Sequence, residues 1–208
     1  MTAFTRIGRS QTLVAVLAAG KGRRFGENKL LAPCCGMPVV AWALKAIDAA
    51  GFEPGVLVCR PLFAAKLGVA TEWSFLEVQE RQATPLSHSI GLAVGAAQHL
   101  GAESLLVCLA DMPLVEPDHL KRVGTCEGVA ATIHEDGGLG VPARFPASYY
   151  PRLLELRGDQ GAGKLLRGLT DITRCAAPTS TLLDVDTPDD IRTAENILAC
   201  RGSGDRSQ

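Results

Sequence analysis

The sequence predicts an α/β fold in which a mostly parallel sheet is flanked by helices, as in Rossmann-like domains. Short runs rich in leucine and valine alternate with longer alanine-rich segments throughout the chain. Leu13–Leu17 (LVAVL) and Ser104–Leu109 (SLLVCL) are apolar without interruption, which is typical of strands covered on both faces. A chain of 208 residues, 47% of them hydrophobic, suits one domain. We expect that domain to span residues 13–200, with flexible termini at 1–12 and 201–208.

The first half of the chain should alternate strand and helix. The strand at Leu13–Leu17 leads into a loop rich in glycine and basic residues, Gly20–Lys29. Proline suits the first turn of a helix and glycine the position after its end, so Pro38 and Gly51 predict a helix over Val39–Ala50. The next apolar runs predict a strand at Gly55–Cys59, a helix at Leu62–Leu67 and a strand at Phe75–Val78.

The second half continues the alternation with weaker signals. Serine is a favoured helix N-cap, so Ser87 and Ser89 predict the start of a helix that runs to about His99. The strand Ser104–Leu109 should follow, and then a short helix that begins at Asp118. The remaining expected elements are a strand at Val129–Ile133, helices at Ala147–Arg157 and Gly161–Leu169, a strand at Leu182–Val185, and a helix from Pro188 to Cys200.

The composition excludes several classes of protein. A formal net charge of −1 gives no reason to expect binding to nucleic acid or to an anionic membrane. No apolar stretch is long enough to span a bilayer. The seven cysteines are scattered without the spacing of a metal site, which favours buried thiols in a reducing, cytoplasmic compartment.

The loop after the first strand has the composition of a polyphosphate site. Gly20, Gly22 and Gly26 allow a ligand to approach the backbone closely. Four cationic side chains surround these glycines: Lys21, Arg23, Arg24 and Lys29. Backbone amides and cations at the carboxyl end of a first strand suit phosphate groups.

Two glycine patterns, one in this loop and one near residue 160, have alternative interpretations. The spacing GxGxxxG in this loop is similar to some dinucleotide-binding turns, which would make the chain an oxidoreductase domain, but a second apolar segment, Leu30–Pro33, precedes the next helix. The stretch Gly158–Lys164 fits GxxxxGK, but Leu165 replaces the serine or threonine that a P-loop uses to bind magnesium. We therefore reject a P-loop and keep the first pattern as an alternative.

Two acidic positions are candidate metal ligands. Asp111 follows the strand Ser104–Leu109 and should face the crevice where α/β sheets bind ligands. Asp186 precedes the last helix, whereas Asp189 and Asp190 fall in its first turn, where acidic residues are favoured by the helix dipole. Carboxylates beside a phosphate loop are what Mg²⁺ requires. We expect Asp111 and Asp186 to converge beside Lys29.

These segments together resemble the GT-A-like nucleotidyltransferases, specifically the molybdenum cofactor cytidylyl- and guanylyltransferase group. The resemblance rests on Leu17–Lys29, Leu109–Pro113 and Asp184–Pro188, and it covers roughly Leu13 to Ala199. It implies a single GT-A domain, with Mg²⁺ bound by Asp111 and Asp186, and with Arg24, Lys29 and Asp111 as catalytic residues. The residues that it assigns to nucleotide binding are Leu17, Ala18, Ala19, Gly20, Gly22, Arg23, Arg24, Lys29, Ser87, His88 and Ser89.

The resemblance also implies a reaction. Ala18-Ala19-Gly20 looks like the cytidylyl branch, because the methyl group of Ala19 takes space that a purine would need. Pro85 and Ser87, however, stand where that branch commonly has glycine, and His88 is as easily structural as substrate-binding. The expected activity is transfer of CMP from CTP to molybdopterin with release of pyrophosphate, for a client molybdoenzyme. The alternatives are a guanylyl- or sugar-phosphate nucleotidyltransferase, or a non-catalytic protein that delivers the molybdenum cofactor.

Overall fold

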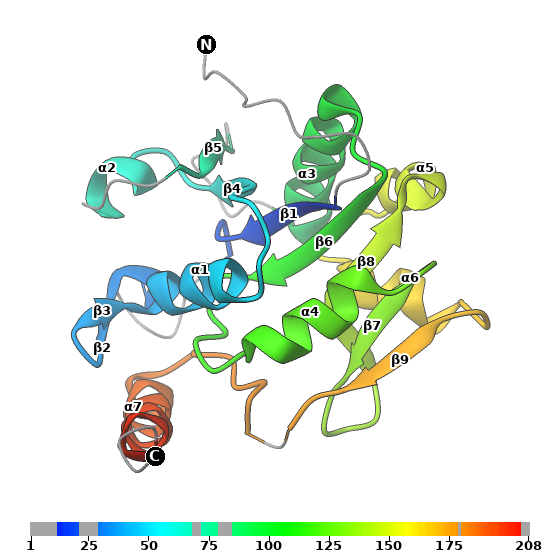
Figure 1. The fold of residues 1–208 in the computed structure, drawn as a ribbon. Helices are drawn as coiled ribbons and strands as arrows, with labels where there is room; N and C mark the ends of the chain where they lie inside the picture. Colours follow the sequence, from blue (N-terminus) through cyan, green and yellow to red (C-terminus); the bar gives the residue numbers. More distant parts are fainter. Residues whose placement is uncertain (1–11, 21–28, 68–71, 79–84, 179, 205–208) are drawn as a thin grey trace.

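The computed structural model describes residues 12–20, 29–67, 72–78, 85–178 and 180–204, and it confirms the α/β architecture (Figure 1). In the described residues the main sheet has the strand order β5-β4-β1-β6-β8-β7-β9. Its strands are β1 (Thr12–Leu17), β4 (Val56–Cys59), β5 (Ser74–Glu77), β6 (Ser104–Leu109), β7 (Ala130–Ile133), β8 (Leu139–Pro146) and β9 (Thr173–Ala176). The helices are α1 (Val39–Ala49), α2 (Phe63–Leu67), α3 (Leu86–Leu100), α4 (Pro117–Thr125), α5 (Tyr150–Leu154), α6 (Ala162–Arg167) and α7 (Pro188–Gly204).

The sheet is parallel in its first half and mixed in its second. Strand β1 pairs in parallel with β4 and β6, and β4 pairs in parallel with β5. Strand β8 is antiparallel to both β6 and β7, whereas β9 is parallel to β7. The carboxyl ends of β1 and β6 therefore lie side by side, and this edge of the sheet carries the candidate site.

Helices cover both faces of the sheet, which explains why β1 and β6 are apolar after their first residues, Thr12 and Ser104. Helices α3, α5 and α6 bury one core with Leu13, Ala15 and Leu17 of β1. Helices α1, α2 and α4 bury a second core, with Val14 and Val16 on the opposite face. Figure 1 shows α1 and α4 on one side of the sheet and α3 and α5 on the other.

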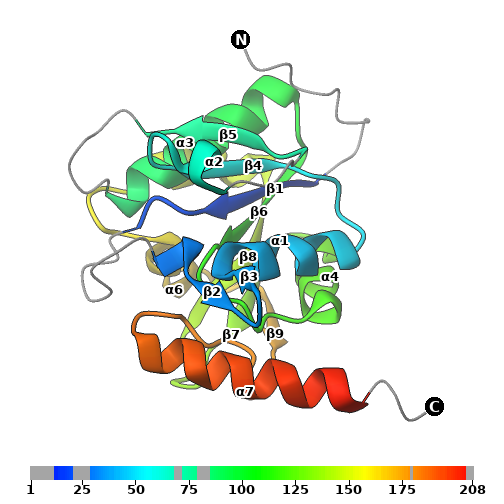
Figure 2. The same ribbon diagram turned by 90° about the vertical axis from the view of Figure 1, so that its left-hand side faces the viewer.

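A third, smaller core joins α7 to the hairpin formed by β2 (Pro33–Cys34) and β3 (Met37–Pro38). The hairpin turns through Cys35 and Gly36, which both have positive φ (47° and 78°), as a two-residue turn of this kind requires. Figure 2 shows α7 beneath this hairpin, far from α3. The buried residues of this core are Cys34, Val39, Leu114, Val185, Ile191 and Ala194.

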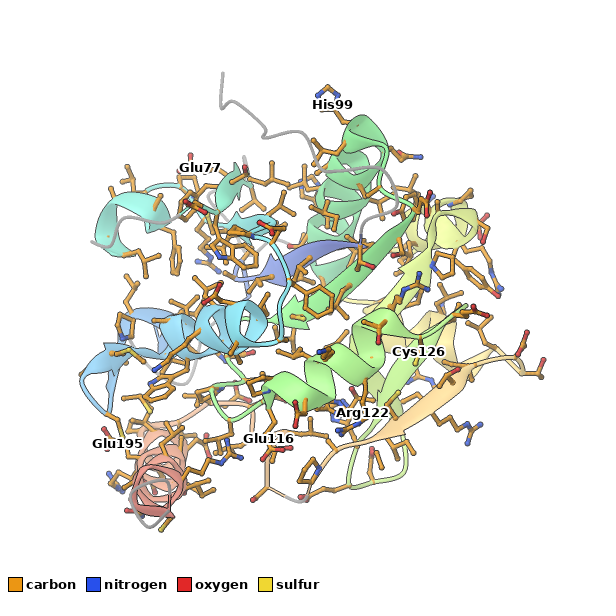
Figure 3. All side chains as sticks on the ribbon, viewed as in Figure 1. Glu77, His99, Glu116, Arg122, Cys126 and Glu195 are labelled. Carbon is orange, nitrogen blue, oxygen red and sulfur yellow. The ribbon has the colours of Figure 1, made fainter. Side chains whose placement is uncertain are left out.

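A buried polar network ties α4 to the mixed half of the sheet. His119 is fully buried, and its Nε2 donates to Oγ1 of Thr132 (2.8 Å), which in turn donates to the carbonyl of Pro142 (2.8 Å). Arg122, labelled in Figure 3 beside β9, donates to Nδ1 of His119 (3.3 Å) and to the carbonyl of Ala176 (3.4 Å). Burial and the neighbouring Arg122 lower the pKa of His119 to about 4, so the ring is neutral at pH 7.

Some local predictions were wrong. Helix α3 begins at Leu86 with Pro85 as N-cap and no side-chain cap, so Ser87 and Ser89 lie within the helix. Leu182–Val185 forms no strand, whereas β8 and β9 were missed. The helix expected over Ala147–Arg157 is a 3₁₀ turn (Ala147–Tyr149) followed by the short α5. Within the described chain, none of the helices is both long and apolar enough to cross a membrane.

Candidate active site

Three charged residues from distant parts of the chain converge at the carboxyl edge of the sheet. The Nζ of Lys29 lies 2.7 Å from Oδ2 of Asp111 and 2.8 Å from Oδ1 of Asp186. Lys29 begins a 3₁₀ turn (Lys29–Leu31), Asp111 follows β6, and Asp186 directly precedes α7. The structure thus brings together the two aspartates and the lysine that the sequence analysis expected to meet.

Backbone hydrogen bonds hold these segments in place. The amide of Ala110 donates to the carbonyl of Leu17 (3.1 Å), which continues the β1–β6 pairing to the residue before Asp111. The amide of Val185 donates to the carbonyl of Asp111 (2.9 Å), so the segment before α7 is attached directly to the end of β6. The aspartates are therefore neighbours because of main-chain geometry.

The first turn of α7 holds the backbone of Asp186. One carboxylate oxygen of Asp190 accepts hydrogen bonds from the amides of Asp186 (2.9 Å) and Thr187 (2.7 Å) and from the Thr187 hydroxyl (2.8 Å). The Asp190 amide donates back to the Thr187 hydroxyl (3.3 Å), which is the reciprocal arrangement of a capping box. These bonds outweigh the effect of partial burial and lower the pKa of Asp190. Asp190 therefore serves the helix, as its position in the first turn predicted.

The cluster has an excess of negative charge. The Lys29 side chain is only 8% exposed, and burial alone would lower its pKa, but attraction to Asp111 and Asp186 prevails and raises it. The carboxyl group of Asp184 is crowded by its surroundings, although the residue is exposed, and this desolvation together with repulsion from Asp111 raises its pKa to about 6. One ammonium group therefore faces two carboxylates, beside a third acidic side chain, and cannot neutralise them all.

The donor set fits a magnesium ion completed by substrate. Asp111 and Asp186 supply hard carboxylate oxygens, and their side chains are 22% and 53% exposed, so both can reach an incoming ligand. Within the described ranges no group of three or more histidine, cysteine, aspartate or glutamate side chains is arranged to hold a metal. Protein Mg²⁺ sites often use one or two carboxylates, with phosphate oxygens and water filling the other positions.

A cavity of about 260 Å³ opens beside the cluster. Six of the residues expected to bind nucleotide line it: Leu17, Ala18, Ala19, Gly20, Lys29 and Ser89. Asp111 also lines it, and so does Asp159, to which the sequence analysis gave no role. The segment around Asp159, Gly158–Lys164, was considered in the sequence analysis only as a P-loop, which was rejected, so it gave no signal for this position. Among described residues, the cavity thus combines a backbone turn, a cation and carboxylates.

Other predicted residues stand apart from this cavity. Ser87 and His88 occupy the first turn of α3 but are not among the described residues that line it, and the Ser87 amide donates to the carbonyl of Gly158 (3.2 Å). His88 is exposed. Gly22, Arg23 and Arg24 lie outside the described residues, so their predicted contacts with phosphate stay predictions.

The sequence matches the family model described as the MobA-like NTP transferase domain over residues 14–175. The purine catabolism protein PucB of Bacillus subtilis is 28% identical over 196 residues, which is 88% of this chain and 95% of that protein. The 2-C-methyl-D-erythritol 4-phosphate cytidylyltransferase of Synechococcus sp. is 31% identical, with 88% of this chain and 94% of the relative covered. The likeness therefore extends over nearly the full length of both relatives.

Solved structures give the same result. Rv0371C of Mycobacterium tuberculosis, crystallised in complex with manganese, superposes with a TM-score of 0.73 at 26% identity and covers 90% of this chain and 98% of its own. The molybdopterin-guanine dinucleotide biosynthesis protein A of Archaeoglobus fulgidus has a TM-score of 0.63 at 26% identity, with coverages of 91% and 100%. The sheet and its helices are thus shared with proteins of this type.

Proposed function

Because this chain belongs to the MobA-like NTP transferase family, we propose that it transfers CMP from CTP to the phosphate of molybdopterin and releases pyrophosphate. The observation that carries the proposal is the convergence of Asp111 and Asp186 on Lys29, beside a cavity lined by the Leu17–Gly20 turn. A divalent cation and a polyphosphate need this combination of carboxylates, ammonium group and backbone turn.

The reaction is an in-line substitution at phosphorus. An oxygen of the acceptor phosphate forms a bond to the α-phosphorus of CTP while the bond from that phosphorus to the oxygen bridging to the β-phosphate breaks, and pyrophosphate leaves. The acceptor phosphate is already ionised at neutral pH, so no general base is needed. Catalysis of this kind depends on positioning and on stabilisation of negative charge.

The residues of the chain divide these tasks. Asp111 and Asp186 would hold Mg²⁺, which when bound would neutralise charge on the phosphate oxygens. Lys29 would stabilise the departing pyrophosphate, together with the predicted contribution of Arg24. The Leu17–Gly20 turn would hold the base and ribose, and the methyl group of Ala19, which lines the cavity, favours the smaller pyrimidine.

A second acceptor class has a specific observation in its favour. The relative at 31% identity is named for a cytidylyl transfer to 2-C-methyl-D-erythritol 4-phosphate, and nearly its whole length aligns. A polyol or sugar phosphate acceptor would use the same phosphate and metal residues. The choice between the two acceptors therefore depends on a part of the molecule other than the Lys29 cluster.

A panel of substrates tests the proposal. Purified protein should release pyrophosphate from CTP in the presence of Mg²⁺ and molybdopterin, and it should do so faster than from GTP or UTP. Replacing molybdopterin with 2-C-methyl-D-erythritol 4-phosphate should abolish turnover. Faster turnover of GTP would overturn the assignment of the base, and no release from any nucleotide with either acceptor would overturn the proposed activity.

A further inference from the structure

The end of α4 packs against the strand β9, and each side of this contact carries a cysteine. Cys126 directly follows α4, and Cys175 is the third residue of β9. Arg122, one helical turn before Cys126, donates to the carbonyl of Ala176, the residue after Cys175 (3.4 Å). Figure 3 labels Cys126 and Arg122 near the end of α4. The packing of a helix on a strand therefore brings together two cysteines that are 49 positions apart in the chain.

The two thiols are in direct contact. Cys175 is buried in the core that α1, α2 and α4 cover, and Cys126 packs against the same core. Burial raises the pKa of Cys175 to about 11, and repulsion from the Cys126 thiol and a hydrogen bond between the two thiols contribute further. A disulfide forms without backbone movement only where the two side chains already point toward each other, and this pair meets that condition.

The other cysteines have no comparable arrangement in the part of the chain that the structure describes. Cys59 and Cys108 are buried, and Cys200 is exposed on α7. Cys34 and Cys35 also share a hydrogen bond between thiols, but they are adjacent in the β2–β3 hairpin. Consecutive Cα atoms are about 3.8 Å apart, which is shorter than the span of roughly 4.4 Å or more that an unstrained disulfide needs.

The two thiols of the pair differ in their access to solvent. Cys126 is partly exposed, whereas Cys175 lies beneath it in the core. The Cys126 thiol also donates to the carbonyl of Arg122 (3.0 Å), which holds it at the end of the helix. A reagent that approaches from solvent should therefore meet Cys126 first, with Cys175 in place as the second thiol.

We propose that Cys126 and Cys175 are a redox-sensitive pair that a small disulfide, such as glutathione disulfide, converts to an intramolecular bridge. The Cys126 sulfur attacks one sulfur of the small disulfide, and the released thiolate takes up the proton that Cys126 loses. The Cys175 sulfur then attacks the sulfur of Cys126, the mixed disulfide breaks, and the second departing thiolate takes up the proton of Cys175. The cysteines lose two electrons in total, and the small disulfide is reduced to two thiols.

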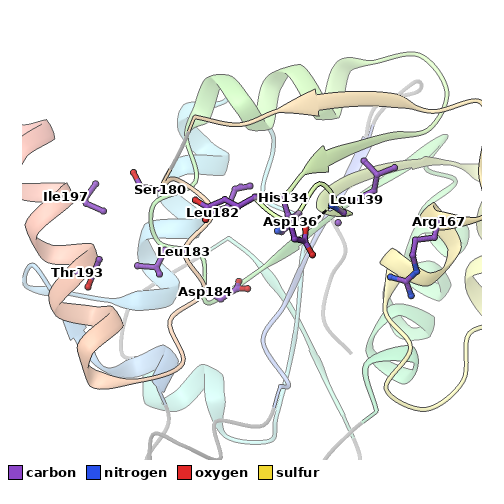
Figure 4. Close-up of a pocket in the computed structure, with 13 residues that line it drawn as sticks. His134, Asp136, Leu139, Arg167, Ser180, Leu182, Leu183, Asp184, Thr193 and Ile197 are labelled. Carbon is purple, nitrogen blue, oxygen red and sulfur yellow. Dashed lines mark hydrogen bonds between the residues drawn. The ribbon is translucent and has the colours of Figure 1, made fainter.

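The bridge would fasten a strand that has one neighbour in the described sheet. Strand β9 is last in the strand order and pairs with β7. Beyond β9, residues 180–184 line a large cavity of about 660 Å³, which α6, α7 and the β7–β8 hairpin also line (Figure 4). A covalent bond at Cys175 therefore restrains the strand that leads into the wall of this cavity.

Equilibration of the full chain with glutathione buffers tests the pair. The reduced protein is incubated with increasing ratios of glutathione disulfide to glutathione, quenched with acid, alkylated and digested, and bridged peptides are identified by mass spectrometry. Cys126→Ser removes the accessible thiol of the pair, and Cys175→Ser removes the buried one. Cys35→Ser is the matched control, because it removes an exposed thiol from the β2–β3 hairpin.

We expect one bridge, between Cys126 and Cys175, in both the wild type and Cys35→Ser. Cys126→Ser should form no bridge, and Cys175→Ser should keep one glutathione on Cys126. Oxidation should raise the Tm of the wild type by roughly 5 °C or more, because the bridge closes a loop of about 50 residues. It should also slow amide hydrogen exchange in β9 about tenfold, and Cys126→Ser should show neither change.

Three outcomes would overturn the proposal. The first is a wild-type chain without a bridge once the reaction with excess glutathione disulfide is complete. The second is a bridge between Cys34 and Cys35 in place of the expected one, and the third is an equal rise in Tm on oxidation of Cys126→Ser. Cys126→Ser alters a partly exposed side chain, and circular dichroism of the reduced variant checks its fold, so the test holds even if Cys175→Ser fails to fold.

Discussion

The polar clusters at Lys29 and at His119 differ in charge balance and in exposure to solvent. In the cluster at Lys29, one ammonium group contacts two carboxylates that are partly open to solvent. In the cluster at His119, both ring nitrogens of the buried imidazole and the hydroxyl of Thr132 are hydrogen-bonded, in a series that runs from Arg122 to the Pro142 carbonyl, and the imidazole is uncharged. A surplus of charge that stays accessible can exchange partners, whereas buried polar groups that are already hydrogen-bonded serve to hold elements together. Binding chemistry is therefore expected at the first cluster and architecture at the second.

The largest expected effect is loss of turnover on removing one carboxylate of the Lys29 cluster. Asp111→Asn removes a charged metal ligand and should lower kcat/KM for pyrophosphate release roughly 10³-fold. The carboxylate holds the cation that would stabilise negative charge on the phosphate oxygens during transfer. The matched control is Asp189→Asn, an exposed aspartate in the first turn of α7. Equal activity of the Asp111 variant and the wild type would contradict a catalytic role and favour a protein that only delivers the cofactor.

The next effect concerns stability at the His119 cluster. The folded pKa is about 4, below the ordinary value of 6.5, so the unfolded chain binds the extra proton between these values and stability falls as the pH is lowered from about 6.5 to 4. The full loss is about 3 kcal/mol, at 1.36 kcal/mol for each unit of pKa difference.

Urea denaturation of the wild type and of His119→Leu across this pH range measures the effect. The variant has no imidazole to protonate, so the difference in unfolding free energy between the two proteins should shrink by about 3 kcal/mol as the pH falls. A difference that is independent of pH would show that the buried ring does not titrate in this way.

The smallest expected effect concerns competition between the Lys29 ammonium group and a metal ion for the two carboxylates. It binds the same carboxylate oxygens that a divalent cation would use, so Lys29→Met should bind Mn²⁺ roughly tenfold more tightly in the absence of nucleotide. Electron paramagnetic resonance of free Mn²⁺ measures this directly. Weaker binding in the variant would mean that the lysine assists the metal site instead of occupying it.

The clusters also differ in how far the sequence predicted them. Leu13–Leu17 and Leu105–Leu109 are continuous apolar runs that predict buried strands. A carboxylate just after such a run, as at Asp111, predicts a ligand site at the edge of the sheet. His119 gave no such signal, because a single histidine on a short helix has no spacing that distinguishes a buried hydrogen-bonding role from a surface one. The same holds for Asp159, which reaches the first cavity only through the path of the loop before α6.

The mixed half of the sheet was harder to predict for physical reasons. Strand β8 contains Gly140, Pro142 and Arg144, which weaken both the apolar pattern and the β propensity. Strand β9 is a short edge strand with only Cys175 buried, so it lacks the apolar run of a central strand. The large cavity has no sequence signature, because segments separated by many residues supply its lining and only the folded chain brings them together.

Helix α7 is fastened at both ends. Asp190 fixes its first turn, and Arg201 near its other end donates to the Leu114 carbonyl (3.1 Å) and pairs with Glu116 (3.1 Å). The same helix carries Asp186 at its start and turns Thr193 and Ile197 toward the large cavity. Because both ends of α7 are held, the side chains that line the large cavity keep a fixed position relative to the carboxylate of Asp186.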